Sequence, residues 1–464
     1  MRYRLGLSTL LLSGCAPGVE LAAPPPVLST QWSVAPSDRL AGETRTLAEA
    51  FGSPELAALV QRALAANPDL GAATARIQQA RAQLRSARAE SLPTVSASLG
   101  TRATATDDRG SSPFDFSVGS AGLDLSWEID LFGRQAAGRR SARALLAASE
   151  FDRAAVALSI EAELARAFVQ HAVLRHRIGL LERNIASARE LERIIATRLR
   201  LGAATRVDTG IQAVEVRQLE VERTRLLEAR DRTRNAIALL VGEEAPVFSA
   251  PETAFDSLAA PAIALVQPGE LLVRRPDVRA AEARIAAASG DVARARAAFL
   301  PQLRLSASGL GQAAALGGPI GLTAAIGADL LAPIFNRGRL RGELDFSSGV
   351  QRESVELYRS ALLQAFREAE DALAGAEQSR ARVALLDQIV EEARVTARLA
   401  RLQYVEGYAD LQTVVTAEGS LVAVEDARAV ALQERLDAAI DLYRAMGGPG
   451  IAAPLPPQTV AARN

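Results

Sequence analysis

Residues 67–100 read NPDLGAATARIQQARAQLRSARAESLPTVSASLG, and residues 275–308, which start 208 positions later, read RPDVRAAEARIAAASGDVARARAAFLPQLRLSAS. In both copies an Ala- and Arg-rich segment with helical spacing starts at a proline, Pro68 or Pro276, where the missing N–H costs nothing. A second proline, Pro93 or Pro301, then ends the helix. Alternating polar and apolar residues follow it, which is typical of a strand. The sequence therefore predicts two copies of one helix-then-strand unit.

The duplication extends well beyond this stretch. Residues 131–134 (LFGR) correspond to residues 334–337 (IFNR), and Gly202 and Gly242 correspond to Gly407 and Gly447. Two copies of one unit of roughly 200 residues therefore make up the body of the chain. We expect a lipoprotein signal peptide over residues 1–14, a lipidated linker over 15–52, the first repeat over 53–246, an inter-repeat linker over 247–266, the second repeat over 267–448 and a C-terminal tail over 449–464.

Each repeat is predicted to contain one β-hairpin. Polar and apolar residues alternate around 95–99 and 114–118, and again around 303–307 and 320–326. Each segment has the roughly 10-residue length that a tilted strand needs to cross a bilayer. Open strand edges cannot lie in hydrocarbon, so one chain with four strands cannot close a barrel. Two chains would give a barrel filled by side chains, whereas three chains would leave a lumen.

Long helices follow each hairpin. No proline occurs between residues 136 and 200, and a helix of about 65 residues would be roughly 100 Å long. The second repeat supplies a similar helix over 339–404, and returning helices of about half that length are expected over 207–241 and 411–446. The helices that precede the hairpins fit the remaining length if they stack end to end on the returning helices. We therefore expect an α+β membrane protein with a long, thin-walled helical tunnel and, if the protein conducts anything, a trimeric 12-stranded β-barrel that continues into this tunnel.

The single cysteine, Cys15, indicates the cellular compartment to which the protein is exported. Arg2 and Arg4 precede an apolar run over residues 5–12, and the following residues end in Leu-Ser-Gly-Cys, which looks like a bacterial lipobox. Because Ala16 is not the aspartate that retains such lipoproteins in the inner membrane, we expect export to the cell outer membrane with a covalent lipid on Cys15. No later stretch has the roughly 18 uninterrupted apolar residues of a transmembrane helix.

Composition excludes several other classes of function. A net charge of −1 leaves no basic excess to neutralise the phosphates of a nucleic acid. One cysteine excludes an intramolecular disulfide, and with only two histidines we expect no metal site and no cofactor. His171 and His176 are expected on a solvated helix face. The sequence has no phosphate-binding glycine loop, zinc-protease motif or nucleophile elbow, so no enzyme activity is expected.

The motifs at residues 127–134 (WEIDLFGR) and 274–282 (RRPDVRAAE), the turn at 199–208 and the duplicated layout together resemble the TolC-type outer membrane factors. The nearest resemblance is to their lipoprotein branch, the NodT-type channels of resistance-nodulation-division efflux systems. It implies a homotrimeric, passive conduit for small molecules in the outer membrane. Its partners would be a periplasmic adaptor (membrane fusion) protein and an inner-membrane resistance-nodulation-division transporter.

The resemblance also implies that the two helix-to-helix turns farthest from the strands close the tunnel and meet the adaptor. The candidate residues are Leu201, Gly202, Arg206, Asp208, Tyr404, Gly407 and Asp410. Asp208 matches an acidic tip residue of the family, and Tyr404 matches a tyrosine at the constriction; a packing role is the alternative for Tyr404. For the two glycines the alternative is a helix C-cap.

Arg206 and Asp410 are candidates for ionic locks, with plain solvated charge as the alternative. The sequence departs from the family at one point. Thr413 and Thr416 occupy positions where many relatives carry acidic residues that favour cations, so a cation-selective ring would need Asp410 or Glu418 to point into the lumen.

Two other functions remain open from sequence alone. One is the outer membrane component of a type I protein secretion system, which uses the same fold; the lipobox and the NodT-like motifs favour efflux. The other is a coiled-coil scaffold, which suits long Ala-rich helices but explains neither the lipobox nor the hairpins. The sequence does not identify the transported substrates, because selection in such pumps usually lies in the inner-membrane component.

Overall fold

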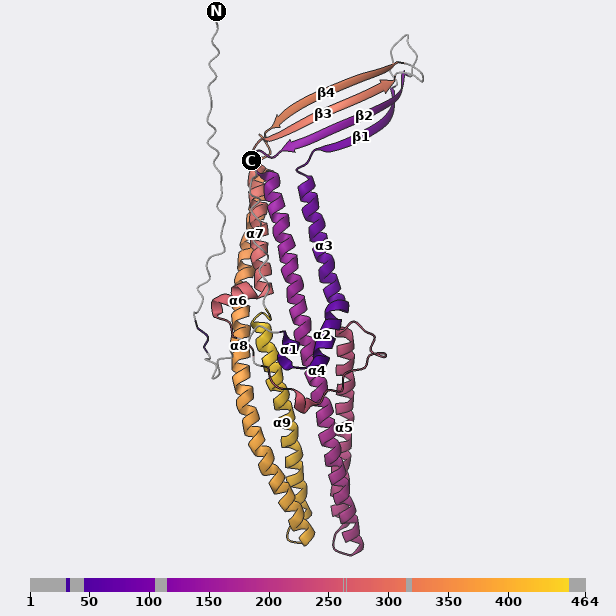
Figure 1. Ribbon diagram of the computed structural model, residues 1–464, viewed down its shortest axis with the longest axis vertical. Helices are drawn as coiled ribbons and strands as arrows, with labels where there is room; N and C mark the ends of the chain where they lie inside the picture. Colours follow the sequence, from indigo (N-terminus) through magenta and orange to yellow (C-terminus); the bar gives the residue numbers. More distant parts are fainter. Residues whose placement is uncertain are drawn as a thin grey trace, which may run out of the picture.

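The computed structural model describes residues 31–33, 46–104, 115–261, 263, 265–313 and 319–449. These residues form an elongated molecule with helices along its length and a β-sheet at one end (Figure 1). The helices are α1 (Leu47–Phe51), α2 (Pro54–Ala66), α3 (Pro68–Ala89), α4 (Arg134–Arg200), α5 (Arg206–Leu240), the 3₁₀ helix η1 (Phe255–Ser257), α6 (Pro268–Arg274), α7 (Pro276–Ala297), α8 (Arg337–Glu406) and α9 (Leu411–Ala445). The signal peptide with Cys15, the loop over 107–113 and the tail from residue 450 lie outside the described residues.

The sheet contains β1 (Thr94–Thr104), β2 (Asp115–Ile129), β3 (Gln302–Ala313) and β4 (Ile320–Leu331) in the order β1-β2-β3-β4. All three pairings are antiparallel, which confirms one hairpin per repeat. The pairing of β2 with β3 joins the two repeats into one sheet. β1 and β4 are therefore the two open edges of the sheet.

The registers divide the side chains of the sheet into two chemically different faces. On one face Leu123 of β2 lies opposite Ala97 and Gly309, and the exposed large side chains of this face are aliphatic: Val95, Leu99, Leu123, Ile320, Leu322, Ile326 and Leu330. The other face carries Ser96, Ser98, Ser120, Asp124, Ser126, Glu128, Arg304, Ser306, Ser308, Thr323 and Asp329. An apolar outer face and a polar inner face are the pattern of a transmembrane barrel.

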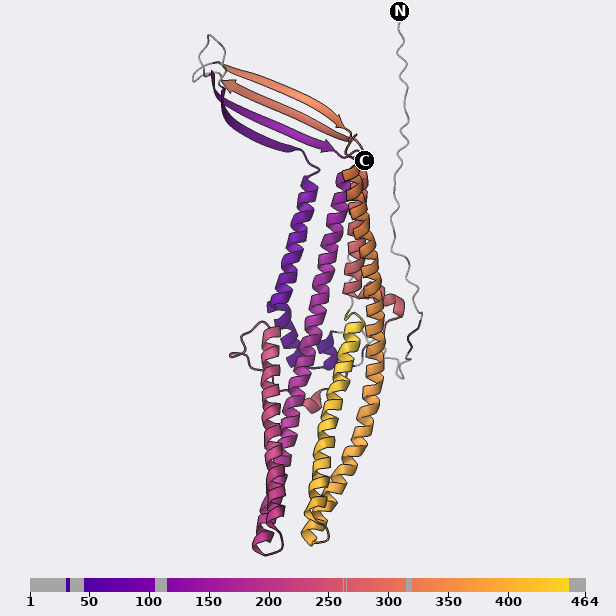
Figure 2. The ribbon, with the colours of Figure 1, turned by 180° about the vertical axis from the view of Figure 1, so that it is seen from behind.

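Two very long helices span the helical part. α4 has 67 residues and α8 has 70, so each is about 100 Å long. α4 packs between the α3–α5 stack and the α7–α9 stack, and α8 packs on α7 and α9, as both ribbon views indicate (Figures 1 and 2). One protomer is therefore an open section of wall, with α3, α5 and β1 at one border and α8 and β4 at the other. No described helix is long and apolar enough to span a membrane.

The shorter helices stack end to end, as expected, through one repeated contact. At the lower end of α3, the Asn67 Nδ2 donates to the carbonyl of Leu240 at the end of α5, at 2.9 Å. At the equivalent position of the second repeat, Arg275 Nη1 donates to the carbonyl of Ala445 at the end of α9, at 3.3 Å. A side chain at the start of each upper helix thus satisfies a carbonyl that the lower helix leaves unpaired.

Arg275 makes ion pairs in addition to the stacking contact that it shares with its counterpart Asn67. It is only 6% exposed, and its Nη2 lies 2.6 Å from Asp277 and 2.8 Å from Glu368 of α8. Burial lowers the pKa of Arg275, but the two carboxylates outweigh this and raise it. Burial likewise raises the pKa of Glu368, and hydrogen bonds from Gln364 and Arg275 reverse that, so its pKa is lowered overall. This cluster joins α7, α8 and α9.

The expectation of two solvated histidines was wrong. His171 is 8% exposed, and burial lowers its pKa. His176 lies under the connection between the repeats, where its Nδ1 is 3.7 Å from Asp256 and its ring centroid is 5.4 Å from that of Phe255. Sequence periodicity within α4 could not reveal this cover, because the covering segment comes from a distant part of the chain.

Candidate functional site at the helical tips

The two turns predicted to form the gate lie together at the end of the molecule opposite the sheet (Figure 1). Gly202 and Gly407 adopt φ of +73° and +87°, the left-handed region that favours glycine. Gly407 is the C-cap of α8, and its N–H donates to the carbonyl of Tyr404 at 3.1 Å. The capping role weighed for the glycines is therefore what the geometry supports. Leu201 and Tyr408 are 77% and 84% exposed, so both turns present apolar side chains.

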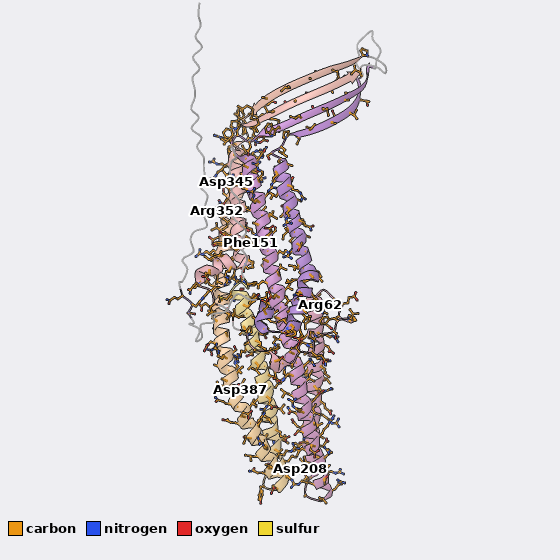
Figure 3. The ribbon with its side chains drawn as sticks, in the orientation of Figure 1. Arg62, Phe151, Asp208, Asp345, Arg352 and Asp387 are labelled. Carbon is orange, nitrogen blue, oxygen red and sulfur yellow. The ribbon has the colours of Figure 1, made fainter. Side chains whose placement is uncertain are left out.

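Both acidic tip residues cap helices. Asp208, labelled in Figure 3, accepts hydrogen bonds from Thr205 N at 2.7 Å and Thr205 Oγ1 at 2.8 Å, while its own N–H donates to Thr205 Oγ1 at 3.2 Å. This reciprocal capping box starts α5. Asp410 starts α9 by accepting from Thr413 Oγ1 at 2.6 Å and Thr413 N at 2.9 Å, which lowers its pKa. Arg206 makes no ion pair with any residue that the structure describes, so an ionic lock would need a second protomer or the adaptor.

Tyr404 lies inside the wall rather than on a surface. It is 5% exposed and clusters with Leu191 and Ile195 of α4 and with Leu411 and Val414 of α9. The guanidinium carbon of Arg198 sits 4.6 Å from the centroid of its ring, and Arg198 Nη1 donates to the Tyr404 carbonyl at 3.0 Å. Tyr404 therefore joins the hairpin made by α4 and α5 to the hairpin made by α8 and α9.

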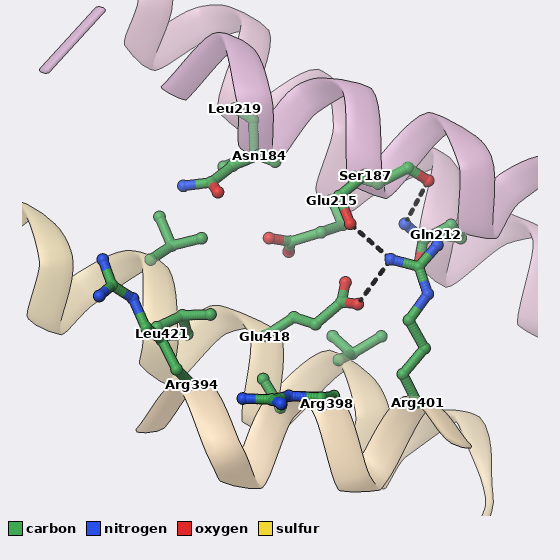
Figure 4. A pocket seen from close by; sticks show the side chains of 14 residues that line it. Asn184, Ser187, Gln212, Glu215, Leu219, Arg394, Arg398, Arg401, Glu418 and Leu421 are labelled. Carbon is green, nitrogen blue, oxygen red and sulfur yellow. Dashed lines mark hydrogen bonds and ion pairs between the residues drawn. The ribbon is translucent and has the colours of Figure 1, made fainter. Parts of the chain in front are cut away.

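A cavity of about 270 Å³, lined by apolar and charged side chains, lies between these two hairpins (Figure 4). Arg401 of α8 reaches across it, and its Nη1 donates to Ser187 Oγ of α4 at 2.6 Å and lies 3.6 Å from Glu418 of α9. Glu215 of α5 lines the same cavity on the opposite wall (Figure 4). Arg401 thus extends from the second hairpin to the first.

The Glu418 carboxylate and the Gln212 amide, which both line the cavity, are incompletely compensated by charge or hydrogen bonds. Burial raises the pKa of Glu418, Arg401 partly offsets this, and the charge of Glu215 raises it further. Gln212 of α5 is 1% exposed; its Nε2 donates to the Ala188 carbonyl at 3.0 Å, but its Oε1 has no hydrogen-bond partner. A buried acceptor without a donor costs roughly 1–3 kcal/mol. Gln212 Oε1 is therefore an acceptor without a partner among the described residues at the border of this cavity.

The two threonines at the family's acidic positions are both exposed. Thr413 donates to Asp410, and Thr416 Oγ1 accepts from Gln412 Nε2 at 3.3 Å. The acidic alternatives considered for them are occupied within the protomer: the Asp410 carboxylate caps α9, and Glu418 faces Arg401.

Sequence reasoning missed Arg401, Arg198 and Ser187. Arg401 lies one turn before Tyr404 on α8, so the signal available was an arginine next to a residue already singled out. Its partner Ser187 is 214 positions away in a helix face with no distinctive motif. Only the packing of the two hairpins brings these residues together.

Known proteins similar to this chain share both its sequence and its shape. A family model described as outer membrane efflux protein matches residues 59–243 and 267–448. The pyoverdine export outer membrane protein OpmQ of Pseudomonas aeruginosa is 37% identical over 92% of this chain and 91% of its own length. Outer membrane protein OprJ of the same species is 30% identical, over 95% of this chain and 94% of its own. The solved outer-membrane channel OprN superposes with a TM-score of 0.83 at 26% identity and covers 92% of this chain and 99% of that one.

Proposed function

The chain belongs to the outer membrane efflux protein family, and we infer that it is the outer membrane channel of a tripartite efflux pump. The observation that carries this is the sheet, whose apolar and polar faces end in two open edges and whose strands run directly into the long helices. Three chains supply twelve strands, close these edges and leave a lumen. The resulting trimer lies in the outer membrane with its helical tunnel in the periplasm. The family is one of transport channels, not of enzymes.

We propose the partners from the resemblance to outer membrane channels of efflux pumps. The conduit is passive, so an inner-membrane transporter supplies substrate and energy, and a periplasmic adaptor connects that transporter to the helical tips. We propose the exposed apolar side chains of Leu201 and Tyr408 as part of the surface that the adaptor meets. Membership of the NodT lipoprotein branch stays a proposal, supported by the Leu-Ser-Gly-Cys sequence at residues 12–15.

The proposed cargo is small molecules. OpmQ, 37% identical, is a pyoverdine export protein, and another relative, TtgI of Pseudomonas putida, 26% identical, is a toluene efflux pump protein. Because these cargoes differ so widely, the channel itself is expected to accept what its pump delivers. Deletion of the gene should therefore raise cellular accumulation of the cargo of the neighbouring pump as much as deletion of the pump does. Unchanged accumulation after deletion of the channel would contradict the proposed function.

Lipidation gives a separate prediction. Replacing Cys15 by Ala should abolish incorporation of radiolabelled palmitate, because Cys15 is the only cysteine of the chain. The four strands of each chain should still hold the trimer in the membrane, so the variant should remain trimeric. Palmitate labelling of the Cys15→Ala protein would refute the lipoprotein proposal.

The proposed role of the Asp208 charge in closing the tips can be tested separately from the role of Asp208 in capping α5. We propose that its charge helps hold the tips closed across the trimer, while in the protomer it closes the capping box with Thr205. Thr205→Ala breaks the box but keeps the charge, whereas Asp208→Asn removes the charge and keeps an oxygen that can accept a hydrogen bond. In planar bilayers at low salt, Asp208→Asn should raise conductance and Thr205→Ala should not. The reverse order would mean that Asp208 acts only as a helix cap.

A further inference from the structure

The polar face of the sheet carries four charged side chains among those the structure describes: Asp124, Glu128, Arg304 and Asp329. Three of them lie together near the helical end, where each carboxylate has an arginine beside it. Arg134 Nη2 lies 2.7 Å from both carboxylate oxygens of Glu128. Arg304 is the direct cross-strand neighbour of Glu128 on one side and of Asp329 on the other.

Asp124 is the exception. It lies four residues before Glu128 on β2, on the same face, so it sits farther into the barrel. Its direct neighbours are Ser96 on β1 and Ser308 on β3, both uncharged. The Asp124 side chain is exposed and has no ion pair with any described residue. Its charge is therefore free to act on whatever passes along this face.

We propose that Asp124 is a specificity-determining residue of the barrel, which favours cationic solutes over anionic ones at this level of the lumen. This rests on the proposed trimeric channel, in which three copies of Asp124 form a ring. A carboxylate on a lumen wall raises the local concentration of cations within about 8 Å at physiological salt. The barrel would then impose a charge preference that the neutral Thr413 and Thr416 on α9 do not supply.

The effect can be measured inside the barrel from the rate at which a cysteine introduced beside Asp124 reacts with charged reagents. Ser308→Cys places a thiol directly opposite Asp124, about 5 Å away between Cβ atoms. Membrane-impermeant methanethiosulfonate reagents of opposite charge, added outside intact cells, reach this thiol through the outer mouth, so the state of the tips does not affect the result. The unaltered protein, whose only cysteine is Cys15, gives the background.

After normalisation to a free thiol, the cationic reagent should react about 3- to 10-fold faster than the anionic reagent at low salt, by the Coulomb interaction at this distance. Adding the substitution Asp124→Asn to the Ser308→Cys protein should bring the ratio of the cationic to the anionic modification rate close to one. Asp345→Asn, an exposed aspartate on α8 below the sheet (Figure 3), should leave the ratio unchanged.

Two results would overturn the proposal. If neither reagent modifies Ser308→Cys from outside, the polar face does not line an open lumen at this level. If Asp124→Asn leaves the ratio unchanged, the carboxylate does not set the local potential. Efflux of the pump's cargo, measured in the same strains, reports separately on the proposed function, because neither Ser308→Cys nor Asp124→Asn alters the tips or the helical wall.

Discussion

Replacing Arg275 by Ala should lower the free energy of unfolding by about 3 kcal/mol, because it leaves the partly buried Glu368 carboxylate without its cation. It also removes the donor to the Ala445 carbonyl, which joins α7 to α9. Denaturant unfolding of the detergent-solubilised protein, followed by far-ultraviolet circular dichroism, measures the change. The matched control is Arg284→Ala on the same helix, whose ion pair with Asp152 is exposed and should contribute less than about 1 kcal/mol.

The first repeat offers a second control. Asn67 makes the same stacking contact without a buried charge, so the double variant Arg275→Asn with Glu368→Gln should recover much of the stability that Arg275→Ala loses. The pH dependence has a defined sign. Because the folded-state pKa of Glu368 is lowered, its contribution is present above its unfolded pKa and is lost as pH falls through the folded pKa. Equal losses for Arg275→Ala and Arg284→Ala would contradict this account of the junction.

Replacing Arg401 by Ala should open the tunnel. We expect each of the three copies to contribute about 1 kcal/mol to the contact between hairpins, since the Arg401 side chain is 30% exposed and its partners are only partly buried. Together they would shift the balance from closed to open about 100-fold. Single-channel recording in planar bilayers should show this as a large rise in open probability. Ser187→Ala removes the described partner of Arg401 on the other hairpin, because Glu418 lies on α9 beside α8, and should therefore raise the open probability to a comparable extent.

Arg394 provides the control for this prediction. It lines the same cavity, but its carboxylate partners, Glu391 and Glu425, lie on α8 and α9, within a single hairpin. Arg394→Ala should therefore leave the open probability near that of the unaltered protein. If Arg394→Ala opens the channel as much as Arg401→Ala does, loss of positive charge in the cavity is responsible and not the contact between hairpins.

Most of the architecture could be predicted from the sequence because each duplicated element has a local sequence pattern that identifies it. Prolines mark the start of α3 and α7, and alternation marks the strands. The absence of proline predicted a helix over 136–200, and α4 covers Arg134–Arg200. The open edges then followed from counting strands, since no single chain of this kind can close a barrel.

The candidate site was less predictable because its residues meet only across helices. Tyr404 was weighed between a constriction and a packing role, and its side chain is buried against Leu191 and Ile195. The sequence indicated the turns that contain Asp208 and Asp410 but not that both carboxylates cap helices. Arg401 shares no motif with Ser187, so their contact depends on how two distant hairpins pack.

In the proposed assembly, three copies of this chain close a barrel whose polar face lines a conduit running into the helical tunnel. A cryo-electron microscopy reconstruction of the full chain in lipid nanodiscs tests it most directly. We predict a three-fold symmetric particle in which β1 of one protomer pairs with β4 of the next, with Asp124 and Ser308 facing the lumen and Leu123 and Ile326 facing lipid. A particle with another symmetry, or one whose apolar face lines the interior, would contradict the account.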